Sequence, residues 1–226
     1  LNPTMAGQTT VDSAPRSTEW CFGRESVLAA IEAIGKGQLV VVVDDESREN
    51  EGDLIMAAEK ATKETIAFMI RHTSGVICVS LAGERLEELE MPQMVVKNED
   101  QKGTAFTVSV DLKHGISTGI SASDRAATFR ALADPKSKAS DFTRPGHVFP
   151  LRAVKGGVLN RDGHTEAAVD LSRLAGLQAV GVLSEITTED GAEMMRVPQL
   201  KEFSKKHNLV MTSIHDMILY RQETGK

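Results

Sequence analysis

The sequence has few cysteines and no long hydrophobic run. Its two cysteines, Cys21 and Cys78, form no C-x-x-C pair, which excludes a disulfide framework and a cysteine-rich zinc site and favours a reducing compartment. No apolar run approaches membrane-spanning length, and the N-terminus lacks the charged start and apolar middle of a signal peptide. Although the chain does not begin with Met, we expect a cytosolic protein that does not bind membranes.

The sequence also lacks an excess of positive charge. Its net charge of −6 argues against nonspecific nucleic-acid binding, so an anionic ligand would need its own local basic site. The 226 residues are 41% hydrophobic and 26% charged, which fits one soluble globular domain. Residues 1–19 are rich in Thr, Ser, Pro, Gly and Ala and have little to bury. We therefore predict a flexible N-terminal arm over 1–19 and a single domain over 20–226.

Helical and strand patterns alternate along the rest of the chain. Apolar residues three or four apart, bounded by glycine, threonine or proline, indicate helices, and short runs rich in β-branched residues indicate strands. The connections vary too much for a repeated βα unit, so we predict an α/β fold with a mixed central sheet. The expected helices start near 24, 62 and 198 and cover about 84–88, 123–132, 165–174 and 214–220; the expected strands cover 39–43, 54–58, 76–81, 105–110, 148–151, 179–186 and 209–211.

A dense acidic loop directly follows the valine-rich strand. Residues 44–53, DDESRENEGD, contain six carboxylates and one arginine, and hard divalent ions prefer oxygen ligands of this kind. A solvated turn is an equally ordinary role for such a run. An EF-hand does not fit, because the glycine is at the ninth loop position and not the sixth. Arg48 would weaken the binding of a divalent ion held only by these carboxylates, because the two cations repel each other. A substrate with oxygens facing both the divalent ion and Arg48 would explain why the loop contains carboxylates and an arginine.

A second candidate site is the segment RDGHTE, residues 161–166, which directly precedes a helical pattern. The start of a helix attracts phosphate through its unpaired N–H groups, and Arg161 could add a charge-assisted contact. A simple Thr165 cap beside a surface arginine is the commoner role of such a segment. His164 favours a functional site, because an imidazole can act as a general base or a metal ligand at neutral pH.

Four further features are more ambiguous by themselves. Glu185 ends an apolar strand, where it could only reach water, or could converge with Glu49 and His164 if their strands are neighbours. Residues 117–125, STGISASDR, suit a sugar or phosphate but equally suit helix capping. The motif R-x-G-H recurs at 144–147, which makes His147 a second candidate base. Cys78 fits a buried packing thiol better than a nucleophile.

Taken together, the motifs DDESRENEGD, STGISASDRA, RPGHVFPLRA, RDGHTEAAVDL and GVLSE closely resemble 3,4-dihydroxy-2-butanone 4-phosphate synthase of riboflavin biosynthesis, over about residues 26–221. The resemblance implies a three-layer α/β fold and a homodimer with sites near its interface. It also implies conversion of ribulose 5-phosphate into 3,4-dihydroxy-2-butanone 4-phosphate and formate, with Mg²⁺ or Mn²⁺ required. The chain contains no cysteine-rich metal motif of a fused GTP-opening cyclohydrolase, so we expect the single-function form.

The resemblance also assigns roles to individual residues. It implies that Glu49 and His164 bind the metal and that carboxylates and an imidazole move protons as the substrate forms an enediol, loses water, rearranges and releases formate. In the acidic loop, Asp44, Asp45, Glu46 and Glu51 would only shape or solvate the turn. The implied catalytic residues are Asp53, His147 and Glu185, and the implied substrate-binding residues are Arg48, Asp53, Thr118, Arg161, Gly163, His164, Thr165 and Glu185.

Two other functions fit parts of the same pattern. A noncatalytic metal-binding or nucleotide-binding module would hold a cation in the acidic loop and a phosphate at residues 161–166, without turnover. A phosphosugar isomerase would also form an enediol but would release no formate. Incubation with ribulose 5-phosphate and magnesium, followed by a formate assay, separates the three.

Overall fold

The computed structural model describes residues 22–226. The predicted arm over 1–19 and Cys21 lie outside the described residues. Within the described part of the chain, no helix is long and apolar enough to cross a membrane.

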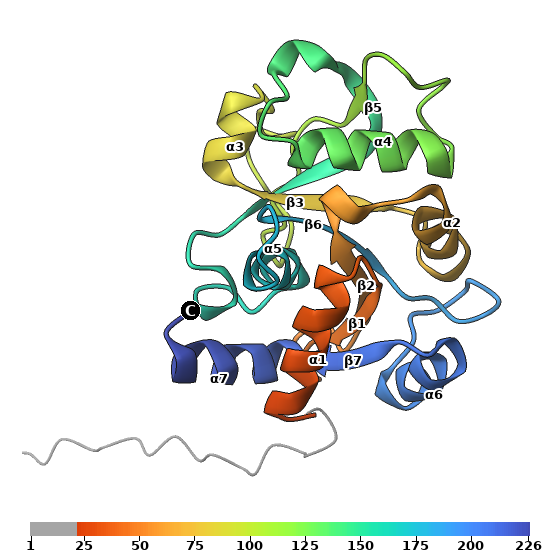
Figure 1. Ribbon diagram of the computed structural model, residues 1–226, viewed down its shortest axis with the longest axis vertical. Helices are drawn as coiled ribbons and strands as arrows, with labels where there is room; N and C mark the ends of the chain where they lie inside the picture. The colour runs from red at the N-terminus through yellow and green to blue at the C-terminus, as the bar shows by residue number, and fades with distance from the viewer. Residues whose placement is uncertain (1–21) are drawn as a thin grey trace, which may run out of the picture.

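A mixed sheet forms the centre of the molecule (Figure 1). Within residues 22–226 it has seven strands in the order β4-β5-β3-β6-β2-β1-β7. β3 is parallel to β5 and β1 is parallel to β7, whereas the other neighbours are antiparallel. The strands are β1 (Val40–Val43), β2 (Gly52–Ala57), β3 (Cys78–Ala82), β4 (Val110–Leu112), β5 (Phe142–Ala153), β6 (Val180–Glu185) and β7 (Val210–Ser213).

Helices cover both faces of this sheet. They are α1 (Arg24–Gly35), α2 (Lys63–His72), α3 (Gly83–Glu88), α4 (Ala122–Ala133), α5 (His164–Leu174), α6 (Val197–His207) and α7 (Ile214–Thr224). Residues of α2, α3, α4 and α6 belong to one core cluster, and residues of α1, α5 and α7 belong to the other.

The burial of strand β1 on both faces explains why its sequence is a continuous apolar run. All four of its valines are fully buried, with Val41 and Val43 in the first core cluster and Val40 and Val42 in the second. A strand covered by helices on both faces has no solvated side, so it has no alternation of polar and apolar residues. The predicted mixed sheet and the three layers implied by the resemblance are confirmed.

Most predicted elements are confirmed with small shifts at their ends. Thr62 caps α2 as expected, because its side chain accepts a hydrogen bond from the Thr65 N–H at 3.2 Å. Strand β2 begins at Gly52, so Asp53 lies on the strand and not in the acidic loop. Strand β5 is much longer than the expected 148–151 and begins at Phe142.

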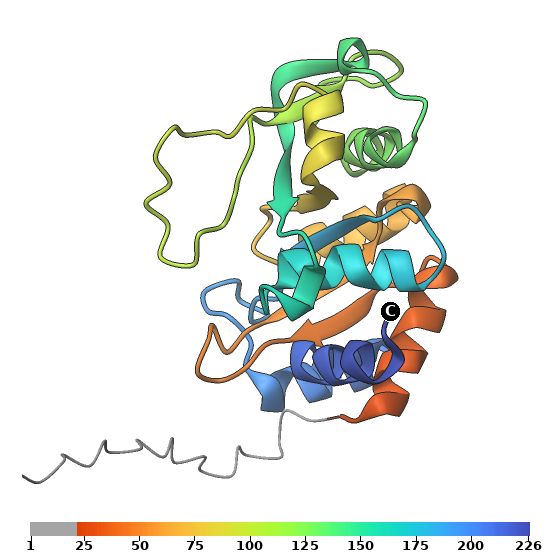
Figure 2. The same cartoon turned by 90° about the vertical axis from the view of Figure 1, so that its left-hand side faces the viewer.

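The predicted strand over 105–110 is wrong except at Val110, the first residue of β4. Residues 105–109 belong to a long connection between α3 and β4, which projects from the body of the molecule in Figure 2. Phe106 and Thr107 form only isolated bridges, and regular pairing begins at Val110. The polar run KNEDQKG over 97–103 forms turns instead of pairing with the sheet, so the alternating residues after it meet β5 only at separate points.

Close packing of α5 on β6 fixes where α5 begins. A Cβ atom added to Gly181 would lie 2.5 Å from the Ala168 carbonyl oxygen, so only a glycine allows the helix backbone to lie this near the strand. His164 is the first residue of α5, and its position therefore depends on this contact.

We predict that Gly181→Ala destabilises the protein by about 1–3 kcal/mol, because the new methyl group would meet backbone that cannot move aside. Urea unfolding followed by circular dichroism measures the change. Gly35→Ala is the matched control, since its Cβ would meet nothing nearer than 3.9 Å. Equal midpoints for the two variants would contradict the packing argument.

Candidate metal and substrate site

Residues from distant parts of the sequence line one polar pocket. Strands β2, β3, β5 and β6, the start of α5, the acidic loop and the connection before β4 all contribute to it. The lining residues are Arg48, Glu49, Asp53, Cys78, Thr104, Phe106, Leu151, Arg161, His164, Thr165, Leu183, Ser184 and Glu185. Seven of the predicted site residues are therefore brought together: Arg48, Glu49, Asp53, Arg161, His164, Thr165 and Glu185.

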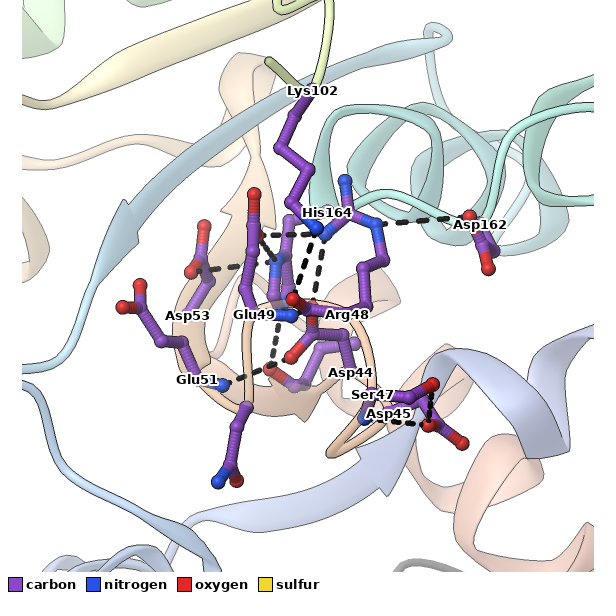
Figure 3. A network of polar contacts seen from close by, with 12 residues as sticks. Asp44, Asp45, Ser47, Arg48, Glu49, Glu51, Asp53, Lys102, Asp162 and His164 are labelled. Carbon is purple, nitrogen blue, oxygen red and sulfur yellow. Dashed lines mark hydrogen bonds and ion pairs between the residues drawn. The ribbon is translucent and has the colours of Figure 1, made fainter.

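The sheet register explains how the acidic groups converge. Asp53 on β2 is directly paired with Glu185 on the neighbouring strand β6. His164 Nδ1 lies 3.7 Å from Glu49 Oε2 and 3.7 Å from Asp53 Oδ1 (Figure 3). Glu185 is also held by Ser74, whose hydroxyl donates to Glu185 Oε2 at 2.7 Å.

His164 is fixed by a hydrogen bond to the sheet. Its Nε2 lies 3.1 Å from the Val42 carbonyl oxygen, to which it can only donate. This contact directs Nδ1 toward Glu49 and Asp53, as a ligating imidazole requires. The His164 side chain is only 7% exposed, so it is held mainly by contacts within the protein.

Asp44 organises the acidic loop from inside. One of its oxygens accepts from the Glu49 N–H at 3.0 Å and from Arg48 at 2.9 Å, and the other accepts from the Glu51 N–H at 2.9 Å. These contacts fit the turn-shaping role expected for Asp44. However, one ligand atom from each of Asp44, Glu49 and His164 also lies within 4.8 Å of the others. Asp44 is thus a candidate third ligand that sequence reasoning missed.

Two cationic side chains hold the acidic loop from outside. Arg196, before α6, donates to the Glu49 carbonyl oxygen at 3.0 Å, and Lys102 donates to the Arg48 carbonyl oxygen at 2.9 Å. Both act on the backbone, so the carboxylate of Glu49 remains directed into the pocket, where it also pairs with Arg48 at 2.7 Å.

The charged side chains in the pocket, together with burial, shift one another's pKa. The His164 imidazole beside Glu49, helped by Arg48, lowers the pKa of Glu49 to about 2. Burial raises the pKa of Asp53 to about 8, although the charge of His164 opposes the rise. Burial disfavours a charged His164, but the surrounding carboxylates of Asp53, Glu49 and Asp44 outweigh it and raise its pKa to about 9.

The donor set fits a divalent cation. Two carboxylates and an imidazole nitrogen converge, and Asp53 Oδ1 is buried with no hydrogen-bond partner among the described residues. In this arrangement the Arg48 guanidinium, which contacts both Asp44 and Glu49, neutralises the carboxylates. Oxygen ligands suit Mg²⁺, and the imidazole favours a softer ion such as Mn²⁺.

The basic side of the pocket is formed at the start of α5. Gly163 is the residue before the helix, and a Cβ there would lie 2.2 Å from Arg161 Nη1 and 3.0 Å from Arg48 Nη2. A glycine therefore lets two guanidinium groups approach the helix start. The alternative of a Thr165 cap with a surface arginine is wrong, since Arg161 is largely buried and no side chain caps the helix.

Glu166 was missed by sequence reasoning. It is fully buried, pairs with Arg161 at 2.6 Å and accepts from the Val154 N–H at 2.9 Å. A buried glutamate in the first turn of a helix resembles an ordinary cap in sequence, and only the fold shows that it holds an arginine. The pocket residues Thr104 and Phe106 were also missed: Phe106 was predicted to lie on a strand, and Thr104, just before it, carries no motif that marks it.

Three predicted site residues do not line this pocket: Gly163, which directly precedes α5, His147 and Thr118. His147 contacts Asp111, with 2.6 Å between Nδ1 and Oδ2, and Thr118 belongs to the turn before α4. That turn is a capping structure: Asp124 accepts from the N–H groups of Ser117 and Gly119. Cys78 is buried, as expected of a packing thiol, and burial raises the pKa of its thiol.

An acidic loop and an imidazole that meet at the ends of central strands of a mixed sheet are typical of an α/β protein that binds a divalent metal ion. The family model of 3,4-dihydroxy-2-butanone 4-phosphate synthase matches residues 28–220. The chain belongs to this family, and the resemblance noted in its motifs is confirmed.

Relatives and solved structures agree with this assignment. The chain is 57% identical to the riboflavin biosynthesis protein RibBA of Nocardia farcinica over 89% of its length and 49% of that protein, and 57% identical to the monofunctional riboflavin biosynthesis protein RIBA 2, chloroplastic, of Arabidopsis thaliana over 89% and 42%. It therefore spans about half the length of the curated relatives it matches.

Among solved structures, a 3,4-dihydroxy-2-butanone 4-phosphate synthase in complex with two magnesium ions is similar, with a TM-score of 0.84 and 50% identity over 88% of this chain and 97% of that one. The Candida albicans enzyme has a TM-score of 0.80 and 48% identity over 89% and 98%.

We predict that divalent-metal affinity rises with pH. With a pKa of about 9, His164 is protonated at neutral pH, and a metal ligand must lose that proton. The apparent affinity for Mn²⁺ should therefore increase up to about tenfold per pH unit below pH 8, as one proton is released per ion. Electron paramagnetic resonance of free Mn²⁺ at pH 6, 7 and 8 measures it.

His164→Asn is the control for this measurement, because it removes the titrating ligand and should flatten the dependence as well as weaken binding. An affinity that is independent of pH in the unaltered protein would contradict the assignment of His164 to the metal.

Proposed function

We propose that this protein converts ribulose 5-phosphate into formate and 3,4-dihydroxy-2-butanone 4-phosphate, the product that the name of its family gives. The observation that carries the proposal is the convergence of Glu49, Asp53, His164 and Glu185 in one pocket beside Arg48 and Arg161. A ketose phosphate needs both halves of this arrangement, a cation site for its adjacent oxygens and a basic site for its phosphate.

Glu49 and His164 hold the divalent ion in this proposal, with Asp44 as a further ligand. A bound Mg²⁺ or Mn²⁺ supplies the Lewis acid that stabilises negative charge developing on adjacent substrate oxygens. The relative solved with two magnesium ions supports a magnesium-dependent site of this kind.

Asp53 and Glu185 move protons in the proposed reaction. Asp53 is 3% exposed, and its pKa of about 8 lets it both accept and donate a proton near neutral pH. Glu185 is its direct neighbour across the β2–β6 pair, and Ser74 fixes its carboxylate. Two carboxylates on adjacent strands can serve neighbouring carbons of one substrate.

The phosphate binds at the start of α5. Thr165 offers a hydroxyl, Gly163 allows close approach, and the first N–H groups of a helix have no partner within it. Arg161 adds a charge that Glu166 holds in place, and the Arg48 side chain extends from the acidic loop toward the start of α5.

A homodimer completes the proposed site. His147 and Thr118 do not line the pocket of their own chain, so a catalytic His147 and a substrate-binding Thr118 act in the pocket of a partner subunit. The 43% exposure of the His147 side chain and the exposed Ile120 beside Thr118 support a surface that a second copy covers. We place this catalytic domain at residues 20–226 and keep the cytosolic location as a prediction.

Purified protein with ribulose 5-phosphate and Mg²⁺ should release formate, and a chelator should stop the reaction. Glu49→Ala should lower the rate of formate release by more than about 100-fold, because the variant lacks a residue that binds the divalent ion directly. Glu46→Ala is the control: it removes an exposed carboxylate of the same loop and should leave the rate near normal. Isomerised sugar without formate would indicate a phosphosugar isomerase, and metal binding without turnover would indicate a noncatalytic module.

Mixing two inactive variants tests the shared site. Glu49→Ala removes a metal ligand from the pocket of its own subunit, whereas His147→Ala removes a side chain that acts in the pocket of the partner subunit. In a dimer with one subunit of each variant, the pocket of the His147→Ala subunit therefore has both residues intact. Random mixing of subunits should restore about a quarter of the normal activity, because half of the dimers are hybrids with one working site each. Differently tagged subunits verify the hybrids. Verified hybrids with no activity would contradict the contribution of His147 to a partner's site.

A further inference from the structure

His147 is held by a carboxylate that the proposed reaction does not otherwise use. Asp111 contacts it twice: Oδ2 lies 2.6 Å from the ring nitrogen Nδ1, and Oδ1 accepts from the backbone N–H of His147 at 2.9 Å. The Asp111 side chain is 8% exposed, whereas that of His147 is 43% exposed. A buried carboxylate thus fixes both the ring and the backbone of a histidine that faces outward.

An irregularity in the sheet brings these residues together. Val110 on β4 pairs with Val148, but the next residue, Asp111, pairs with Thr143. Residues 144–147 therefore have no partners in the β4–β5 ladder and bulge away from it. Bulges redirect side chains, and this one brings the imidazole over the Asp111 carboxylate.

Gly119 closes the contact from the other side. A Cβ at this position would lie 2.2 Å from Asp111 Oδ2 and 2.7 Å from His147 Nδ1, and its φ of +98° is one that other residues rarely adopt. The backbone of the turn before α4 therefore lies directly against the carboxylate and the imidazole, which limits the access of water to their hydrogen bond.

A buried arginine adds charge to this cluster. Arg125 on α4 is 5% exposed, and its Nε has no hydrogen-bond partner among the described residues. It lies near enough to Asp111 for the carboxylate to favour its charged form, against the effect of burial. Asp111 thus has His147 on one side and a guanidinium that acts on it electrostatically.

We infer that Asp111 is a positioning residue for His147, an inference that rests on the proposed function. Asp111 accepts the proton of Nδ1, which leaves Nε2 as the ring nitrogen with a free lone pair. A proton taken from the substrate at Nε2 then stays on the ring, and the negative charge of Asp111 offsets the positive charge formed. The carboxylate itself gains no proton and needs no contact with substrate.

Nuclear magnetic resonance of ¹⁵N-labelled histidine in the unaltered, substrate-free protein tests the first half of this inference. Above the pH at which the ring loses its charge, His147 should carry its proton on Nδ1. Signals assigned by comparison with His147→Gln that place the proton on Nε2 would overturn the inference, whether or not the protein releases formate. Failure of the proposed function alone would leave this signal unchanged.

Kinetics of Asp111→Asn test the second half. The amide keeps the size of the side chain but can donate to Nδ1, which favours the other tautomer. We expect kcat for formate release to fall by about 100-fold or more while KM changes less than about threefold. Asp111→Glu should recover part of kcat, and Asp134→Asn, at the exposed end of α4, should match the unaltered protein.

An unchanged kcat in a folded Asp111→Asn variant would overturn the positioning role. If that variant does not fold, the Asp111→Glu variant and the ¹⁵N signals of the unaltered protein still decide the question, because both report on the carboxylate–imidazole contact directly.

Discussion

The hydrogen bond from His164 to the Val42 carbonyl oxygen is the contact on which the site depends. It connects the first residue of α5 to the strand that leads into the acidic loop, and so fixes the imidazole against Glu49 and Asp53. The close packing of the α5 backbone against β6 at Gly181 supports this contact. Packing between a helix and a strand thus sets the ligand geometry, and no local property of the acidic loop could do so alone.

Concentrated negative charge is the main energetic problem of this site. Buried carboxylates repel one another and lose solvation, which costs free energy unless cations compensate. Arg48 pairs with two of them directly, whereas Arg196 and Lys102 bind loop carbonyl groups from outside. Asp53 remains the least compensated group, as its raised pKa and unpartnered oxygen indicate. The loop is therefore held firmly, while the carboxylate of Asp53 on the neighbouring strand stays without a hydrogen-bond partner for Oδ1 among the described residues.

Local signals predicted most of the fold and part of the site. The valine run and Thr62 marked β1 and the start of α2, because burial and capping act over a few residues. The roles of Asp44 and Glu166 could not be predicted, since each depends on partners that only folding brings near. Residues 105–109 alternate like a strand but form a loop, because the polar segment before Phe106 turns away from the sheet. The placement of His147 away from the pocket likewise depends on a sheet irregularity that leaves no pattern in the sequence.

The unpaired segment at 144–147 has a consequence for how this fold can change. Although these residues take no part in the β4–β5 ladder, they are tightly held: a Cβ at Gly146 would lie 2.0 Å from the Val110 backbone, and Arg144 donates to the Glu90 and Ala139 carbonyl oxygens. The bulge is therefore a constrained part of the scaffold, in which Gly146 and Arg144 hold the backbone and His147 presents its imidazole at the surface. A larger residue at 146 would have to push β4 away, so a change in this segment would also move the carboxylate of Asp111.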